Sequence, residues 1–180
     1  MVTLYHATKK PIGNGKMRKA TRDPADFSDP NRRNAEELLD IMQTGDQSRL
    51  SSWFAFDKAE FAAVYLTIER NRLAPDQKPV EETGFIYAVE MTKFSRHPMI
   101  LVDAIAKKVS TGNRQYADKL AAEYWNPTQN WKFWEYISPE IVFVERTSWP
   151  DPMLIEQAYL AYTISENATL KKFFESSASK

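Results

Sequence analysis

The sequence of 180 residues contains no cysteine, only two histidines (His6 and His97) and no run of 18 apolar residues. Without cysteine the chain forms no disulfide, no thiolate nucleophile and no zinc site built on sulfur. Two histidines also exclude a metal centre with several imidazole ligands, although an all-carboxylate site stays open. Lys9, Lys10 and Pro11 interrupt the N-terminus where a signal peptide would need an apolar core. These absences predict a cytoplasmic protein that has no membrane partner and no metal.

The charge of the chain is balanced overall but uneven along its length. Lysine plus arginine and aspartate plus glutamate each number 24, so no net field draws the protein toward nucleic acid or a membrane. Residues 1–33 carry eight basic and three acidic side chains, a net charge of +5 that the rest of the chain offsets. A chain of this length buries a core large enough for one domain. We expect that domain over residues 1–148, with residues 149–180 as its C-terminal helical extension.

Hydrophobic periodicity and turn-forming residues predict the order of strands and helices. Apolar, β-branched and aromatic runs predict strands at residues 2–8, 52–56, 84–91 and 99–103, and two strands within 133–147 that meet at Pro139. Helical spacing predicts helices at 35–43, 58–73, 116–125 and 152–176, the second of them capped by Asp57. The basic stretch after residue 8 and the polar stretch 21–34 are expected to be loops. Because strands and helices do not alternate regularly, we expect an α+β fold with antiparallel sheet and peripheral helices.

Two side chains in predicted strands are candidates for chemistry, and each has a structural alternative. His6 lies beside Tyr5, where a lone histidine is more often bonded to a backbone carbonyl than to a ligand. Glu135 lies between Trp134 and Tyr136, which strand alternation points to the opposite face of the sheet. Burying such a carboxylate without a partner costs on the order of several kcal/mol. The pattern therefore predicts that Glu135 faces solvent at a sheet edge or lines a polar cleft.

The segment RLSSWFAF places Arg49, Ser51 and Ser52 directly before an apolar strand. A guanidinium group matches phosphate oxygens in bidentate fashion, and neighbouring hydroxyls are natural partners of ribose or phosphate. Alternatively, Arg49 caps a helix end or pairs with a surface carboxylate. Tyr65, on the following helix, is more often a core residue than a ligand. These residues alone leave the structural and the functional interpretations open.

Five short segments in order resemble one superfamily of enzymes. They are LYHATKKPIGNGK, SRLSSWFAFDKAEFAAVYL, FIYAVEM, KLAAEYW and FWEYISPEIVFVE. Together they resemble the diphtheria-toxin-like ADP-ribosyltransferases, and most closely an uncharacterised bacterial family among them. The resemblance spans about residues 2–146 and leaves the C-terminal helix outside. It implies a split antiparallel sheet whose cleft holds NAD as a co-substrate.

The resemblance also implies roles for individual residues. His6 matches the histidine that bonds the adenosine ribose, and Glu135 matches the glutamate that contacts the 2′-hydroxyl of the nicotinamide ribose. A carboxylate there stabilises the positive charge that develops on the ribose as nicotinamide leaves. The aromatic residue that stacks on nicotinamide is Tyr65, or else Trp53 or Phe54. The remaining predicted cofactor contacts are Arg49 with Lys9 or Lys10 on the pyrophosphate, Ser51 or Ser52 on a ribose, and Thr8 of the first motif.

The function that the resemblance implies is NAD-dependent mono-ADP-ribosyl transfer, or the related NAD glycohydrolysis. The acceptor is a macromolecule, either protein or nucleic acid, in a bacterial or phage-infected cell, where a toxin or phage-defence role is compatible. Phe133 stands two residues before Glu135, so the Glu-x-Glu pair that often accompanies protein-arginine specificity is missing. One alternative is a degenerate member that binds a nucleotide or a partner without catalysis. Another is a small nucleic-acid-binding module that uses the basic N-terminal region and aromatic residues such as Trp125 and Trp131.

Overall fold

The computed structural model describes residues 3–19, 21–23, 25, 27, 29–43, 45, 47–71 and 84–178. Two antiparallel sheets form its centre. The four-stranded sheet has the order β1 (Leu4–Thr8), β4 (Phe85–Glu90), β7 (Glu140–Thr147) and β2 (Gly15–Arg18). The three-stranded sheet has the order β3 (Trp53–Ala55), β6 (Trp134–Ser138) and β5 (Ser95–Pro98). The predicted α+β class with antiparallel sheet is confirmed.

An antiparallel bridge joins the two sheets where β1 passes the end of β3. The Tyr5 amide donates to the Phe56 carbonyl at 2.7 Å, and the Phe56 amide donates back to the Tyr5 carbonyl at 2.9 Å. The sheets therefore diverge from a shared corner, and β6 continues through Pro139 directly into β7 of the other sheet. The predicted turn at Pro139 is confirmed.

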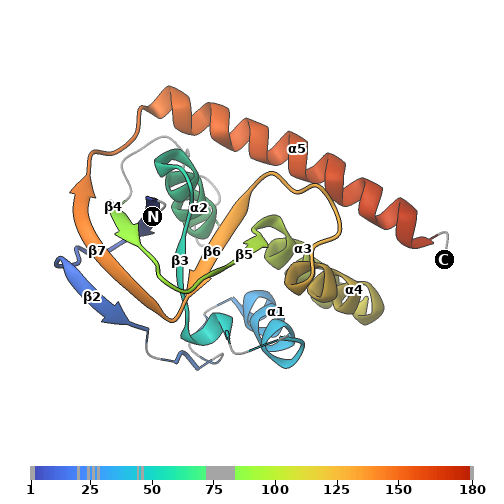
Figure 1. The fold of residues 1–180 in the computed structure, drawn as a ribbon. Helices are drawn as coiled ribbons and strands as arrows, with labels where there is room; N and C mark the ends of the chain where they lie inside the picture. Colours follow the sequence, from blue (N-terminus) through green and yellow to red (C-terminus); the bar gives the residue numbers. More distant parts are fainter. Residues whose placement is uncertain are drawn as a thin grey trace.

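Helices surround this strand framework (Figure 1). Helices α1 (Pro30–Ile41), α3 (Ile100–Ser110) and α4 (Arg114–Trp125) pack together beside the three-stranded sheet. Helix α2 (Ala59–Asn71) lies against β1 and β4, and the long α5 (Pro152–Ala178) crosses over it. Among the described residues no helix combines the length and apolar character needed to cross a bilayer.

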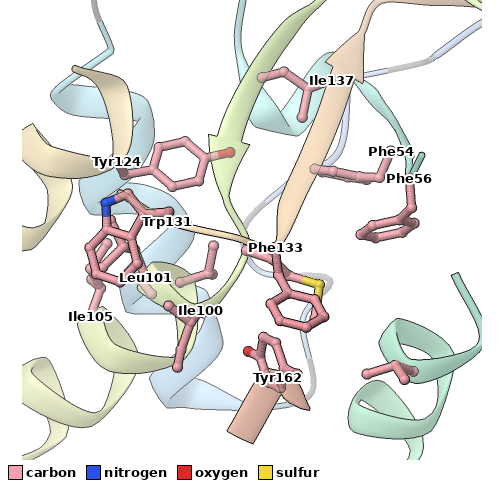
Figure 2. Close-up of a cluster of buried hydrophobic side chains, with 14 of the residues drawn as sticks. Phe54, Phe56, Ile100, Leu101, Ile105, Tyr124, Trp131, Phe133, Ile137 and Tyr162 are labelled. Carbon is pink, nitrogen blue, oxygen red and sulfur yellow. The ribbon is translucent and has the colours of Figure 1, made fainter. Parts of the chain in front are cut away.

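Two hydrophobic cores lie on opposite faces of the three-stranded sheet. The main core joins the helices to one face, where Phe54 and Ile137 meet Tyr124, Phe133 and the aromatic residues shown in Figure 2. The smaller core fills the space between the two sheets, with Tyr87 and Phe143 at its centre and half-buried Trp53 and Tyr136 at its margin. Strand alternation explains the division, because neighbouring residues of β3 and β6 point to different cores.

Helix α1 begins inside the stretch that was predicted to be a loop. Asp29 is its N-cap, accepting a hydrogen bond from the Asn31 amide at 2.9 Å, and Pro30 opens the first turn. Proline disfavours helix at the residue before it but suits the first helical position. The prediction for residues 30–34 was therefore wrong, because the Asp-Pro step marks a helix start here.

Residues 99–103 were predicted as a strand and instead open helix α3. A buried run of four apolar residues, Met99 to Val102, does not distinguish a strand from a helix by periodicity. Two short strands were missed: β2 lies in the predicted basic loop, and β5 has the polar sequence SRHP. Both are edge strands with one neighbour, so tertiary pairing rather than apolar pattern defines them. The other predicted elements are present, although residue 2 of the first predicted strand and residues 72 and 73 of the second predicted helix lie outside the described residues.

Candidate functional site

Glu135 is buried on the main-core face of β6, with 1% of its surface exposed. It stands opposite His97 of β5 in the sheet register. Its Oε1 accepts hydrogen bonds from the Tyr124 hydroxyl at 2.9 Å and from Arg49 Nη1. Burial raises the pKa of Glu135, and the positive charge of Arg49 opposes that rise. The prediction of a solvent-facing edge or a polar cleft was wrong, because a buried arginine partners this carboxylate.

Arg49 is fully buried and joins two carboxylates. Its Nε and Nη2 donate to Glu36 at 2.8 and 3.2 Å, and its Nη1 contacts Glu135 and the Tyr124 hydroxyl. Burial alone would lower the pKa of Arg49, but Glu135 and Glu36 raise it well above its usual value. Glu36 also pairs with Arg32 at 2.7 Å, and the two arginines overcome the effect of burial and lower its pKa to about 2. The result is a charge-balanced network inside the protein.

His97 extends this buried network toward β5. Its ring stacks on Tyr124 with centroids 4.6 Å apart, its Nδ1 donates to the Tyr124 carbonyl at 2.9 Å, and its Nε2 lies 2.7 Å from the Ser95 hydroxyl. Burial lowers the pKa of His97 to about 4, so the ring is neutral at pH 7. The network thus ties helices α1 and α4 to strands β5 and β6. Such an arrangement specifies how these elements meet, and a small molecule has no access to its centre.

His6 lies on the other side of the strand framework, toward the core between the sheets. Its Nδ1 donates to the Phe54 carbonyl at 2.6 Å, and its ring meets the edges of Trp53 and Phe143 at 5.3 and 5.5 Å. Burial lowers the pKa of His6 to about 4, against the opposing effect of the carbonyl bond. The structural interpretation made from the sequence, a histidine bonded to a backbone carbonyl, is confirmed. His6 and Glu135 therefore face different cores.

A basic groove of about 480 Å³ opens near His6, at the turn between β6 and β7. We define the basic groove by its lining residues Arg18, Lys19, Ser51, Thr92, Lys93, Ser138, Pro139 and Glu140. The Lys19 amide donates to the Pro139 carbonyl at 2.9 Å, which holds the end of β2 against this turn. Lys19 Nζ lies 4.3 Å from the ring centroid of Trp53, whose ring also contacts His6. The groove and His6 thus share one aromatic neighbour.

The electrostatics of the basic groove favour an anion. Three of its lining residues are cationic and one, Glu140, is acidic. Lys16 and Arg18 bond that carboxylate at 2.7 and 3.3 Å and hold the pKa of Glu140 below its usual value. Partial burial lowers the pKa of Lys19, with a further contribution from Arg22. A bound phosphate would relieve the cost of keeping these positive charges close together.

The predicted cofactor residues divide between these two regions. Arg49, Ser52, Phe54 and Tyr65 belong to the main-core side: the Ser52 hydroxyl is buried and donates to the Ser48 carbonyl at 2.6 Å, and Tyr65 packs on Phe54 and Phe56. Ser51 lines the basic groove, and Trp53 and His6 lie beside it. Thr8 and Lys9 stand at the exposed end of β1, where the Thr8 hydroxyl accepts from the Lys10 amide at 3.3 Å. The predicted set therefore forms no single cleft.

Sequence reasoning missed the groove residues Arg18, Lys19, Lys93 and Ser138. The excess of positive charge in residues 1–33 was the available signal for the first two. Nothing local marks the others, because the end of β2, the connection between β4 and β5, and the β6–β7 turn meet only in the folded chain. Among the described residues, no three or more histidine, aspartate or glutamate side chains gather to hold a metal ion. Comparisons with protein-family models, curated proteins and solved structures find no significant match to this chain.

Proposed function

We propose that the protein binds a dinucleotide of the NAD type, with the pyrophosphate in the basic groove. The observation that carries this proposal is the grouping of Arg18, Lys19 and Lys93 around a cavity of about 480 Å³, where the one lining carboxylate is already paired. Cations from two segments far apart in the sequence, residues 18–19 and residue 93, converge there in a chain that is neutral overall. That arrangement supports a phosphate-bearing ligand, and the sequence resemblance favours NAD among such ligands.

Side chains around the groove support recognition of the rest of a nucleotide. The hydroxyls of Ser51 and Ser138 suit a ribose, although Ser138 already donates to the Glu140 carbonyl at 2.6 Å. Trp53 offers an aromatic ring beside the groove, and its indole nitrogen is buried without a hydrogen-bond partner among the described residues. A buried donor left unpaired in a native protein calls for an explanation, and a bound ligand is one.

Binding is tested by calorimetry and thermal melting with NAD. At a hundredfold excess over its dissociation constant, NAD should stabilise the protein by roughly 2.7 kcal/mol. The double variant Lys19→Ala/Lys93→Ala should weaken NAD binding about tenfold, equivalent to roughly 1.4 kcal/mol, because it removes two of the three groove cations. The double variant Lys107→Ala/Lys171→Ala removes two exposed lysines elsewhere and should leave binding unchanged.

Two results would contradict this placement. Absence of a melting shift at millimolar NAD would argue against NAD as the ligand. A loss of affinity in Lys9→Ala/Lys10→Ala, without one in the groove variant, would move the phosphates to the loop after β1, as predicted from the sequence resemblance. The variants must first be shown to melt near the wild-type temperature, because Lys19 also contacts Trp53.

The second candidate function is ADP-ribosyl transfer, and it is favoured by the presence of a carboxylate, Glu140, in the groove wall. In that reaction the bond from ribose C1′ to nicotinamide breaks, nicotinamide departs, and C1′ bonds to the acceptor. A carboxylate near the ribose stabilises the intervening positive charge. Glu135, the residue that the resemblance implies, reaches a ribose only if its bond to Arg49 opens.

Labelled NAD, incubated with a cell lysate, tests transfer, and protease and nuclease digestion of the product identifies the acceptor class. If transfer occurs through Glu140, Glu140→Gln should reduce it by roughly a hundredfold or more while Glu135→Gln keeps activity. The reverse result would assign the role to Glu135 and would require the buried network to rearrange. Labelling absent from the wild-type protein, together with retained NAD binding, would favour the non-catalytic alternative.

A further inference from the structure

The face of β5 and β6 opposite Glu135 and His97 carries aromatic and basic side chains at the margin of the smaller core. We define the aromatic strip as Phe94, Arg96, Trp134 and Tyr136. Arg96 stands opposite Tyr136 in the sheet register, so both point to the same face. Their neighbours along the strands, His97 and Glu135, are buried on the other face. The predicted orientation of Trp134 and Tyr136, away from Glu135, is confirmed.

Phe94 and Arg96 of the strip reach solvent, whereas Trp134 and Tyr136 are half-buried where they pack against the two cores. Phe94 is 42% exposed, and its ring meets Tyr136 edge-on with centroids 5.5 Å apart. The guanidinium carbon of exposed Arg96 lies 4.6 Å from the ring centroid of half-buried Trp134. The Trp134 indole donates to the Trp131 carbonyl at 3.1 Å, which fixes the orientation of that ring. The strip is therefore a preformed surface of flat groups, and two of them, Phe94 and Arg96, are free to adjust.

Positive charge continues from the strip into the basic groove. Lys93 lines the groove and directly precedes Phe94, and Ser138 lines it two residues after Tyr136. Arg96 thus stands three residues after Lys93, which lines the groove together with Lys19 and Arg18. The acidic residue of this region, Glu140, is bonded by Lys16 and Arg18. The surface therefore complements a flexible polyanion that carries flat groups.

We propose that the aromatic strip binds single-stranded nucleic acid. Two or three unstacked bases would stack on Phe94, on Tyr136 and on the guanidinium group of Arg96, which lies over the Trp134 ring. Bases stack on aromatic rings and on the planes of arginine guanidinium groups. Lys93 and Arg96 would contact the flanking phosphates. Trp125 and Trp131, the aromatic residues considered for such a role from the sequence, are buried in the main core and take no part. This proposal does not depend on NAD binding, because the four strip residues lie outside the groove lining and only Lys93 is shared between the two proposed sites.

The test is fluorescence anisotropy of labelled single-stranded RNA and DNA oligonucleotides of about 12 nucleotides, without NAD, at low and moderate salt. Binding should be stronger to single strands than to the matching duplex, whose bases are not free to stack. Phe94→Ala should weaken it about fivefold, and Arg96→Glu more than tenfold with a smaller salt dependence. Both residues are exposed, so the variants should fold normally.

Arg114→Glu is the matched control, since Arg114 is an exposed arginine at the start of α4 and pairs with Asp118 there. It should bind oligonucleotides like the wild-type protein. NAD affinity is measured in the same variants and should not change, which separates failure of this proposal from failure of the proposed function. The proposal is overturned if neither single strand binds at low salt, if duplex binds equally well, or if both strip variants bind as the wild type does.

Discussion

Replacing Arg49 with methionine should lower the free energy of unfolding by about 3–5 kcal/mol. The substitution removes the group that donates to Glu36, Glu135 and the Tyr124 hydroxyl at once. It leaves two carboxylates without their main partner in a part of the protein that solvent does not reach. Urea denaturation followed by circular dichroism measures the effect. Loss of NAD binding with unchanged stability would instead support the phosphate contact predicted from the sequence.

Two comparisons show whether the effect arises from the buried network. Arg114→Met removes an exposed arginine and its pair with Asp118, so it should change stability by less than about 1 kcal/mol. The triple variant Arg49→Met/Glu36→Gln/Glu135→Gln removes the unpaired charges as well as the arginine. It should recover part of the lost stability, because the two carboxylates that Arg49→Met leaves without their main partner no longer carry a charge, while Arg32 keeps Asp103 at 3.9 Å. A triple variant less stable than Arg49→Met would contradict this account.

Glu166 should lower stability as pH rises from about 4.5 to about 7. The lowered pKa values of His6 and His97 raise stability over much of the same range, so the contribution of Glu166 is read as the difference between wild type and Glu166→Gln. This carboxyl of α5 is buried, accepts a hydrogen bond from the Lys132 amide at 3.1 Å, and has a second oxygen without a partner among the described residues. Burial raises its pKa from 4.5 to about 7. The folded protein therefore holds a proton that the unfolded chain releases near pH 4.5, so this contribution to stability is complete below that pH and is lost as pH rises through 7. After allowance for solvent screening, the loss should be about 1–3 kcal/mol.

Glu166→Gln should remove this pH dependence and make the protein more stable than wild type at pH 8. Glutamine keeps an oxygen for the Lys132 amide and carries no charge to bury. Urea midpoints at pH 5 and pH 8 measure the difference, and Glu156→Gln, an exposed position on the same helix, is the control. Equal pH profiles for wild type and Glu166→Gln would mean that the carboxyl is ionised without cost in the folded protein.

The local sequence was sufficient to predict most helices and strands, and to predict which side chains of β6 share a face. Its alternation correctly separated Trp134 and Tyr136 from Glu135, because successive residues of any strand point to opposite faces. The same reasoning failed for residues 99–103, because four apolar residues in a row show neither the strand period nor the helix period before Asp103. It also failed for β5, whose polar sequence forms a strand because β6 offers it an edge.

The contacts of the candidate residues could not be predicted from the sequence, because their partners lie far away along the chain. Arg49 meets Glu36 across 13 residues, Tyr124 across 75 and Glu135 across 86. A guanidinium group suits a phosphate and a buried carboxylate equally well, so the segment RLSSWFAF alone does not distinguish these partners. Burial decided between them, since a fully buried arginine must pair with anionic groups of its own chain.

The sequence by itself determined the α+β class, the turn at Pro139 and the excess of positive charge at the N-terminal end, because each depends on residue type and short-range spacing. Only the tertiary structure decided that His6 and Glu135 face different cores and that Lys19, Ser51, Lys93 and Ser138 share one groove. The pairing of β2 with β7 and of β5 with β6 creates that surface. Which strands pair depends on residues far apart in the sequence, because the pairing must bury both hydrophobic cores at once. No local pattern in this chain specifies that pairing.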